Sequence, residues 1–183
     1  MGVQARMYQY SKVHTLYIIY LINTNMTKYV ICNAARADWG KSASLLKLID
    51  SLNQYIIAEP YKYGGDKTVI CSIEGKHILI QTQGDPNTTA FEDTELYIKS
   101  HPEMDIQLYI CATRSRVGQR GQKGISPLEK ARNIAEKYFD RKIIYFRNFY
   151  LFAAYKIEEE QLNSASVEGI RNLIKSLLNI KTL

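Results

Sequence analysis

One octapeptide constrains the fold of this 183-residue chain more than any other feature. It reads Ala35-Arg36-Ala37-Asp38-Trp39-Gly40-Lys41-Ser42, follows the apolar run Tyr29–Cys32 and opens a segment with helical periodicity. A strand, a turn with Gly-Lys-Ser and a helix suit an anion, because the amides of such a turn point inward and the helix start carries positive partial charge. The octapeptide therefore predicts an α/β domain with a phosphate-binding turn.

Three residue types in the octapeptide have a physical role at such a turn. Gly40 lets the main chain approach a phosphate closely, because it has no side chain. Lys41 can reach terminal phosphates, and the Ser42 hydroxyl can ligate Mg²⁺. The pattern thus predicts a site for a magnesium-bound polyphosphate.

The octapeptide resembles the Walker A element of P-loop NTPases, with Ala35 where that family usually has its first glycine. The resemblance implies a three-layer α/β fold, with a mostly parallel central sheet, a hairpin-linked antiparallel strand and helices on both faces. Trp39 is expected to pack either against the nucleotide or against a partner. The predicted nucleotide-binding residues are Ala35, Arg36, Ala37, Asp38, Trp39, Gly40, Lys41, Ser42 and Ala43.

The bulk composition bounds the class of protein. Hydrophobic residues make up 46% of the chain and charged residues 23%, as in ordinary globular domains. Cys32, Cys71 and Cys111 lie in strand-like runs without metal-type spacing, so we expect buried reduced thiols, a cytoplasmic location and no membrane partner. Residues 26–183 are expected to form one domain, and residues 1–25 either an upstream extension or an extra element on the sheet edge. The oligomeric state stays open.

The rest of the chain alternates between strand-like and helix-like segments, which favours a sheet covered on both faces. Residues 54–66 are interpreted as a polar, Tyr- and Gly-rich link, and residues 150–157 as either strand or helix. Thr89 with Glu92 indicates a capping box, and Ser126 with Pro127 a helix start. Apolar spacing predicts helices at 41–53, 89–100, 126–138 and 166–179, and strands at 29–32, 67–73, 77–81, 106–112 and 142–146.

The predicted strand 77–81 runs into the segment Gln81-Thr82-Gln83-Gly84-Asp85. It resembles the Asp-x-x-Gly ending of the GTPase-like branch, with Gln81 at the Asp position, which the family places on the strand beside the phosphate-loop strand. A neutral amide cannot neutralise Mg²⁺, so Asp85 joins Ser42 as a candidate metal ligand, unless Asp85-Pro86 is only a turn. Gln83 is a candidate for orienting a water.

The next strand ends in Thr113-Arg114-Ser115-Arg116, where the GTPase-like branch has its guanine-reading Asn/Thr-Lys-x-Asp. The aspartate that pairs with guanine is missing. Guanine specificity therefore does not follow from the resemblance, and ATP is favoured over GTP.

Charge is unevenly spread along the chain. Residues 113–142 carry nine Lys or Arg against three Asp or Glu, whereas residues 84–105 carry six acids against Lys99. Arg114, Arg116 and Arg120 stand in a Gly-rich loop similar to the arginine-bearing lid of small P-loop kinases, so they are candidate catalytic residues together with Lys41. The alternatives are a basic surface loop and a solvated helix face.

These features favour a Mg²⁺- and ATP-dependent NTPase or small phosphotransferase, acting on a polyanionic or phosphorylated substrate. A non-hydrolysing nucleotide-binding switch is the alternative from another class. A nucleic-acid-associated ATPase is a third, because the basic segment suits a polyanion.

Overall fold

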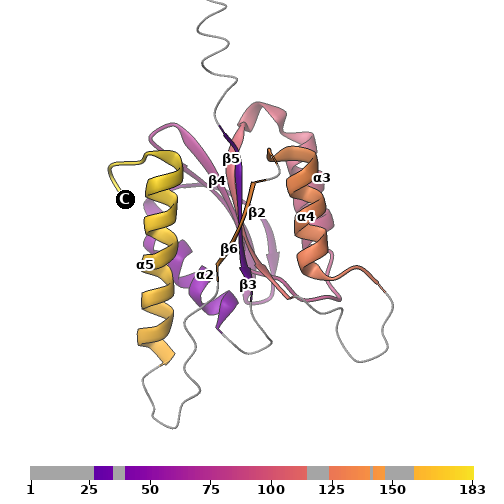
Figure 1. The fold of residues 1–183 in the computed structure, drawn as a ribbon, viewed down its shortest axis with the longest axis horizontal. Helices are drawn as coiled ribbons and strands as arrows, with labels where there is room; N and C mark the ends of the chain where they lie inside the picture. Colours follow the sequence, from indigo (N-terminus) through magenta and orange to yellow (C-terminus); the bar gives the residue numbers. More distant parts are fainter. Residues whose placement is uncertain (1–26, 35–39, 115–123, 141, 147–158) are drawn as a thin grey trace, which may run out of the picture.

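The computed structural model describes residues 27–34, 40–114, 124–140, 142–146 and 159–183 of the chain. These residues form an α/β fold with a six-stranded mixed sheet in the order β2-β3-β4-β5-β1-β6 (Figure 1). Three strand pairings are parallel and two are antiparallel. The strands are β1 (Tyr29–Ala34), β2 (Ile56–Tyr63), β3 (Asp66–Ile73), β4 (Lys76–Gln81), β5 (Ile106–Thr113) and β6 (Lys142–Phe146).

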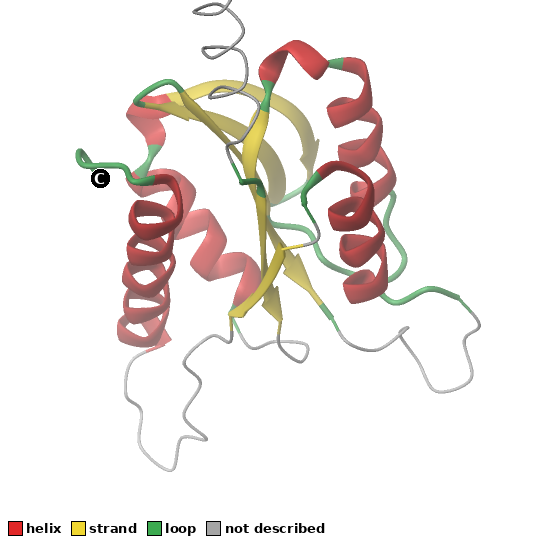
Figure 2. Cartoon of the chain, turned by 45° about the horizontal axis from the view of Figure 1, so that its top comes forward, coloured by secondary structure: helices red, strands yellow, loops and turns green. Residues whose placement is uncertain are grey.

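Four α-helices in the described residues cover both faces of the sheet, as expected (Figure 2). They are α2 (Lys41–Ser51), α3 (Ala90–Ser100), α4 (Pro127–Tyr138) and α5 (Glu159–Leu178). On one face, α2 and α5 bury an apolar cluster that includes Ile31, Leu45 and Ile174. On the other face, α3 and α4 bury a second cluster around Tyr109 and Phe139. No helix in the described ranges is both long and apolar enough to span a bilayer.

Most predicted elements are confirmed, because their apolar positions follow the period of a helix or a strand. Ser126 caps α4 by accepting the Glu129 backbone N–H at 3.2 Å, as predicted. The capping box at α3 is wrong, since the Thr89 hydroxyl donates to the Asp93 carboxylate at 2.8 Å instead of accepting a backbone N–H. All three cysteines are buried and free, as expected.

Strand β5 lies between β1 and β4, which corrects the expected order. The resemblance to the GTPase-like branch implies that the strand ending in Gln81 lies beside the phosphate-loop strand, but β1 pairs with β5 and β6. All eight positions of β5 are buried, so this strand is apolar on both faces and belongs in the middle of the sheet. Strand β6 exposes Lys142 and Tyr145 and takes the edge.

Two further expectations about the bounds of the elements are wrong. The supposed link at 54–66 contains β2, which pairs with β3 across the turn at Gly64-Gly65, where Gly64 has a φ of 62°. Helix α5 is described from Glu159, seven residues before the predicted start at 166, and its polar first turns bond to α2. Asn163 accepts the Ser44 hydroxyl at 3.0 Å there. Residues 1–25 and 150–157 lie outside the described residues.

Candidate functional site

The start of α2 stands just beyond the carboxyl end of β1, at the lower end of the sheet in Figure 1. Gly40, the N-cap of α2, has a left-handed conformation with φ 64° and ψ 16°, which glycine adopts at little cost. The first turn contains no acidic side chain, and Lys41 is only 6% exposed. The positive end of the helix is therefore not neutralised by a carboxylate of its own first turn.

The described part of the octapeptide is Gly40, Lys41 and Ser42, and Ala43 follows in the helix. The other predicted nucleotide-binding residues, Ala35 to Trp39, lie outside the described residues. The predicted strand and helix are confirmed by β1 and α2, whereas the phosphate-binding turn between them stays a prediction.

Ser42 is bonded to the end of β4. Its Oγ donates to the backbone carbonyl of Thr82 at 2.9 Å, across 40 residues of sequence. A serine hydroxyl has one proton to donate and two lone pairs, so this bond orients the proton away and leaves lone pairs for a cation. Thr82 is itself held, since its hydroxyl donates to Asp66 at 2.7 Å and accepts the Lys67 N–H at 2.9 Å.

Gln81 does not face the Ser42 hydroxyl. Its Oε1 accepts the Thr94 hydroxyl at 2.8 Å and the Tyr109 hydroxyl at 2.7 Å, and its Nε2 donates to the Gln83 carbonyl at 2.6 Å. These partners place the amide on the α3/α4 face. Burial raises the pKa of the Tyr109 hydroxyl well above its usual range, so that hydroxyl stays protonated and donates. The Gln81 amide, which stands where the GTPase-like branch has its aspartate, thus makes its hydrogen bonds inside the core.

Gly84 lies where the main chain of segment 81–85 comes close to the main chain at the end of β5. A Cβ at this position would lie 2.2 Å from the Ala112 carbonyl oxygen, well inside van der Waals contact. Only glycine fits here without a shift of main chain. Segment 81–85 is therefore packed directly against the end of β5, and this steric requirement was not foreseen from the sequence.

Asp85 and Arg114, predicted separately as metal ligand and charge stabiliser, form an ion pair. Nη2 of Arg114 lies 2.6 Å from Oδ1 of Asp85, and the two side chains are 29% and 51% exposed. The Arg114 carbonyl also accepts the Leu128 N–H of α4 at 3.1 Å. The other two candidate arginines, Arg116 and Arg120, lie outside the described residues.

Unsatisfied polar atoms gather at this end of the sheet. Of seven buried side-chain atoms without a hydrogen-bond partner in the described residues, six belong to residues at or next to the carboxyl ends of β1, β4 and β5. Buried polar atoms are normally paired, and ligands of open α/β sheets bind at this edge. The residues are Asn33, Thr68, Gln83, Thr113 and Arg114.

Sequence reasoning assigned no role to Asn33, which is completely buried and unpaired at both its amide atoms within the described residues. Thr113 is also completely buried, and its hydroxyl has no partner in the part of the chain that the structure describes. Each is the polar residue that ends an apolar run, in Ile31-Cys32-Asn33 and in Cys111-Ala112-Thr113. That transition from apolar to polar is the signal that would have found them.

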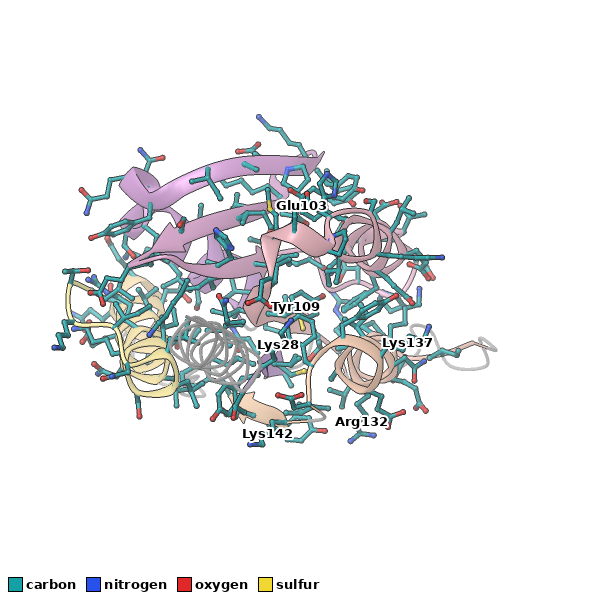
Figure 3. All side chains as sticks on the ribbon, turned by 90° about the horizontal axis from the view of Figure 1, so that it is seen from above. Lys28, Glu103, Tyr109, Arg132, Lys137 and Lys142 are labelled. Carbon is teal, nitrogen blue, oxygen red and sulfur yellow. The ribbon has the colours of Figure 1, made fainter. Side chains whose placement is uncertain are left out.

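Helix α4, the helical part of the basic segment 113–142, faces helix α3 of the acidic segment 84–105. Lys130 and Lys137 of α4 lie 2.6 and 2.7 Å from Glu92 and Glu95 of α3. These pairs favour the interpretation of α4 as a solvated helix face. Figure 3 shows Arg132 and Lys142 farther out, toward the β6 edge. The Arg132 guanidinium there contacts Tyr145, 5.8 Å from the ring centroid.

The described residues contain no cluster of three His, Cys, Asp or Glu that could hold a metal ion. Mg²⁺ is usually bound by one or two protein ligands together with waters and substrate phosphates, so Ser42 suits it only alongside a phosphate. No family model matches the chain, and no curated protein is significantly similar to it.

Proposed function

We propose that this chain is a P-loop nucleotide-binding protein with the three-layer fold of that superfamily. It binds Mg²⁺ and ATP at the start of α2 and acts as an NTPase or a small phosphotransferase. The observation that carries the proposal is the Ser42 hydroxyl, bonded to the Thr82 carbonyl at 2.9 Å beside a left-handed Gly40. A hydroxyl oriented in this way presents lone pairs where a phosphate-bound cation would sit.

The other roles follow from charge and position. Lys41 contributes positive charge from a nearly buried position, where its attraction to a phosphate is less screened than at the surface. Main-chain N–H groups of Ala37 to Lys41 would form the phosphate cradle. The side-chain polar atoms of Asn33, Gln83 and Thr113, which have no partner among the described residues, support a ligand at this edge of the sheet.

A non-hydrolysing nucleotide switch is the second candidate, and one observation favours it. Gln81 spends its amide inside the core, and the Asp85 carboxylate is held by Arg114 at 2.6 Å. Among the described residues, no contact of segment 81–85 therefore brings a carboxylate to Ser42. If no carboxylate helps to hold the cation, the chain would bind the nucleotide without hydrolysing it.

The binding test is calorimetry and thermal unfolding with ATP and GTP, each with and without Mg²⁺. Ligand at about 100-fold over its dissociation constant adds roughly 2.7 kcal/mol to the free energy of unfolding. In a domain of this size this raises the Tm by about 5–10 °C. We expect ATP with Mg²⁺ to give the largest shift.

The matched variants are Lys41→Met and Lys47→Met, two lysines of the same helix. Lys47 lies farther along α2 and bonds to Ser164 at 3.0 Å, so its loss leaves the candidate site unchanged. We expect Lys41→Met to abolish the ATP-induced shift and Lys47→Met to keep it. Equal shifts in both variants, or none in the unaltered chain, would exclude the proposed site.

Release of ADP at steady state separates the enzyme from the switch. An enzyme turns over ATP above the Lys41→Met background, and a phosphotransferase does so faster when its acceptor is present. Tight binding with turnover no higher than that background would leave only the switch.

A further inference from the structure

Arg114 is incompletely satisfied at the edge of the candidate site. The Arg114 Nη2 lies 2.6 Å from the Asp85 carboxylate, whereas the Arg114 Nε is buried and has no partner in the described residues. A guanidinium has five N–H donors in a planar fork that suits two oxygens of a carboxylate or a phosphate. The Nε, unpaired among the described residues, therefore has an N–H group that can donate to a further anionic oxygen.

A short segment connects Asp85, the partner of Arg114, to the candidate cation site. The Ser42 hydroxyl is bonded to the Thr82 carbonyl, and Asp85 follows three residues later. Three residues span at most about 11 Å, so the ion pair lies within reach of a triphosphate held at Ser42. Between them, Gly84 rests on the Ala112 carbonyl, which fixes the path of the segment.

The contact between Asp85 and Arg114 is of a kind that a ligand can displace. The Asp85 side chain is 51% exposed, and ion pairs at such exposure contribute little to stability. A magnesium-bound triphosphate attracts both partners, since the cation draws the carboxylate and the phosphate oxygens draw the guanidinium. Neither attraction exists without the ligand.

We propose that Asp85 occupies Arg114 in place of a nucleotide phosphate, and that the ion pair opens when the nucleotide binds. This inference rests on the proposed nucleotide site and assigns its regulation. Asp85 lowers the affinity for free ATP by competing for Arg114. Mg²⁺ relieves that competition, because it offers the carboxylate another cation.

The test is the affinity of the full chain for ATP, measured by calorimetry with Mg²⁺ and in EDTA. In EDTA we expect Asp85→Asn to bind ATP roughly three- to tenfold more tightly, and Arg114→Gln to bind it more weakly by a similar factor. In the double variant, Asp85→Asn should change nothing further, because the residue it competes for is gone.

Glu92→Gln is the matched control. Glu92 pairs with Lys130 at the same 2.6 Å, with side chains 55% and 21% exposed, but between α3 and α4. We expect this variant to bind ATP as the unaltered chain does. Thermal unfolding of each variant confirms that it is folded.

Unchanged or weaker binding of ATP in EDTA by Asp85→Asn would overturn the competition, as would equal tightening by Glu92→Gln. Weaker binding in Mg²⁺ alone, with no gain in EDTA, would make Asp85 a metal ligand and also overturn it. Failure of the unaltered chain to bind ATP overturns the proposed function as well, whereas binding with no effect of Asp85→Asn overturns this inference only.

Discussion

The two ends of segment 81–85 differ in how their polar groups are satisfied. At the first end, Gln81 is completely buried and its amide bonds to Thr94, Tyr109 and the Gln83 carbonyl. At the other end, Asp85 and Arg114 are partly exposed, and the Arg114 Nε is unpaired in the described residues. A saturated buried network resists change, whereas an exposed and incomplete pair can exchange partners.

This contrast divides a short stretch of chain into a fixed part and an adjustable part. The fixed part aligns the Thr82 carbonyl that accepts the Ser42 hydroxyl. The adjustable part ends on Arg114, the last described residue before the segment that carries Arg116 and Arg120. Three substitutions test whether the two parts differ as much as their contacts indicate, and a fourth tests an exposed carboxylate elsewhere in the fold.

Gly84→Ala should have the largest effect, because a methyl group would lie 2.2 Å from the Ala112 carbonyl oxygen. We expect a loss of about 3 kcal/mol in the free energy of unfolding. This would lower the Tm by roughly 6–12 °C in a thermal melt. Gly65→Ala is the control, since its Cβ would meet nothing within 4 Å. Equal melting of the two variants would mean that segment 81–85 is not pressed against β5.

Gln81→Leu should come next. The substitution leaves the buried hydroxyls of Thr94 and Tyr109 without their acceptor, at a cost of about 2 kcal/mol measured by denaturant unfolding. Adding Thr94→Val and Tyr109→Phe should recover part of that loss, because neither buried hydroxyl is then left without an acceptor. A triple variant less stable than Gln81→Leu would argue against the network as the source of the effect.

Asp85→Asn should change stability by less than about 1 kcal/mol, since the ion pair is partly exposed. The measurement is chemical unfolding at low and at high salt, where the small effect should shrink further because salt screens exposed charges. Glu92→Gln should behave alike, as its pair with Lys130 has similar exposure. A loss as large as that of Gln81→Leu would abolish the distinction between the two ends.

Glu74 provides a comparison for the exposed ion pair, because its carboxylate is also exposed and lies far from segment 81–85. Its carboxylate accepts the Thr182 hydroxyl and the N–H groups of Lys181 and Thr182, which lower its pKa below the ordinary value. These bonds are therefore intact above the ordinary pKa of glutamate and lost as pH falls through the lowered one. We expect the amide resonances of Lys181 and Thr182 to shift together only as the pH falls below the ordinary pKa of glutamate.

In Glu74→Gln the same resonances should be insensitive to acid, because no carboxylate titrates next to them. Shifts that persist in this variant would assign the acid response to another group. The global stability should hardly change in either case, which makes this the smallest of the four effects.

Elements with a clear apolar period were predictable, and those with mixed composition were not. Helix α2 and strands β3 and β4 lie where the spacing of Leu45, Leu48 and Ile80 indicates. The composition of strand β2 predicts a link, because its alternating burial is carried by tyrosine, alanine and proline as well as isoleucine. The turn at Gly64-Gly65 was the available signal for a hairpin.

At the candidate site, the residues were predictable and their relations were not. Ser42, Asp85 and Arg114 were each identified by residue type and position along the chain. That Asp85 and Arg114 neutralise each other depends on the order of strands, because Asp85 follows β4 and Arg114 follows the adjacent β5. Pairing between strands is long-range and leaves no local pattern in the sequence.

The sequence by itself determined the local elements of this protein and the Gly-Lys-Ser start of α2, because backbone preferences and apolar periods act over a few residues. Only the tertiary structure decided that β5 separates β1 from β4, that Gln81 turns into the core and that Ser42 donates to Thr82. These outcomes follow from which apolar faces pack together, and packing joins residues that are distant along the chain.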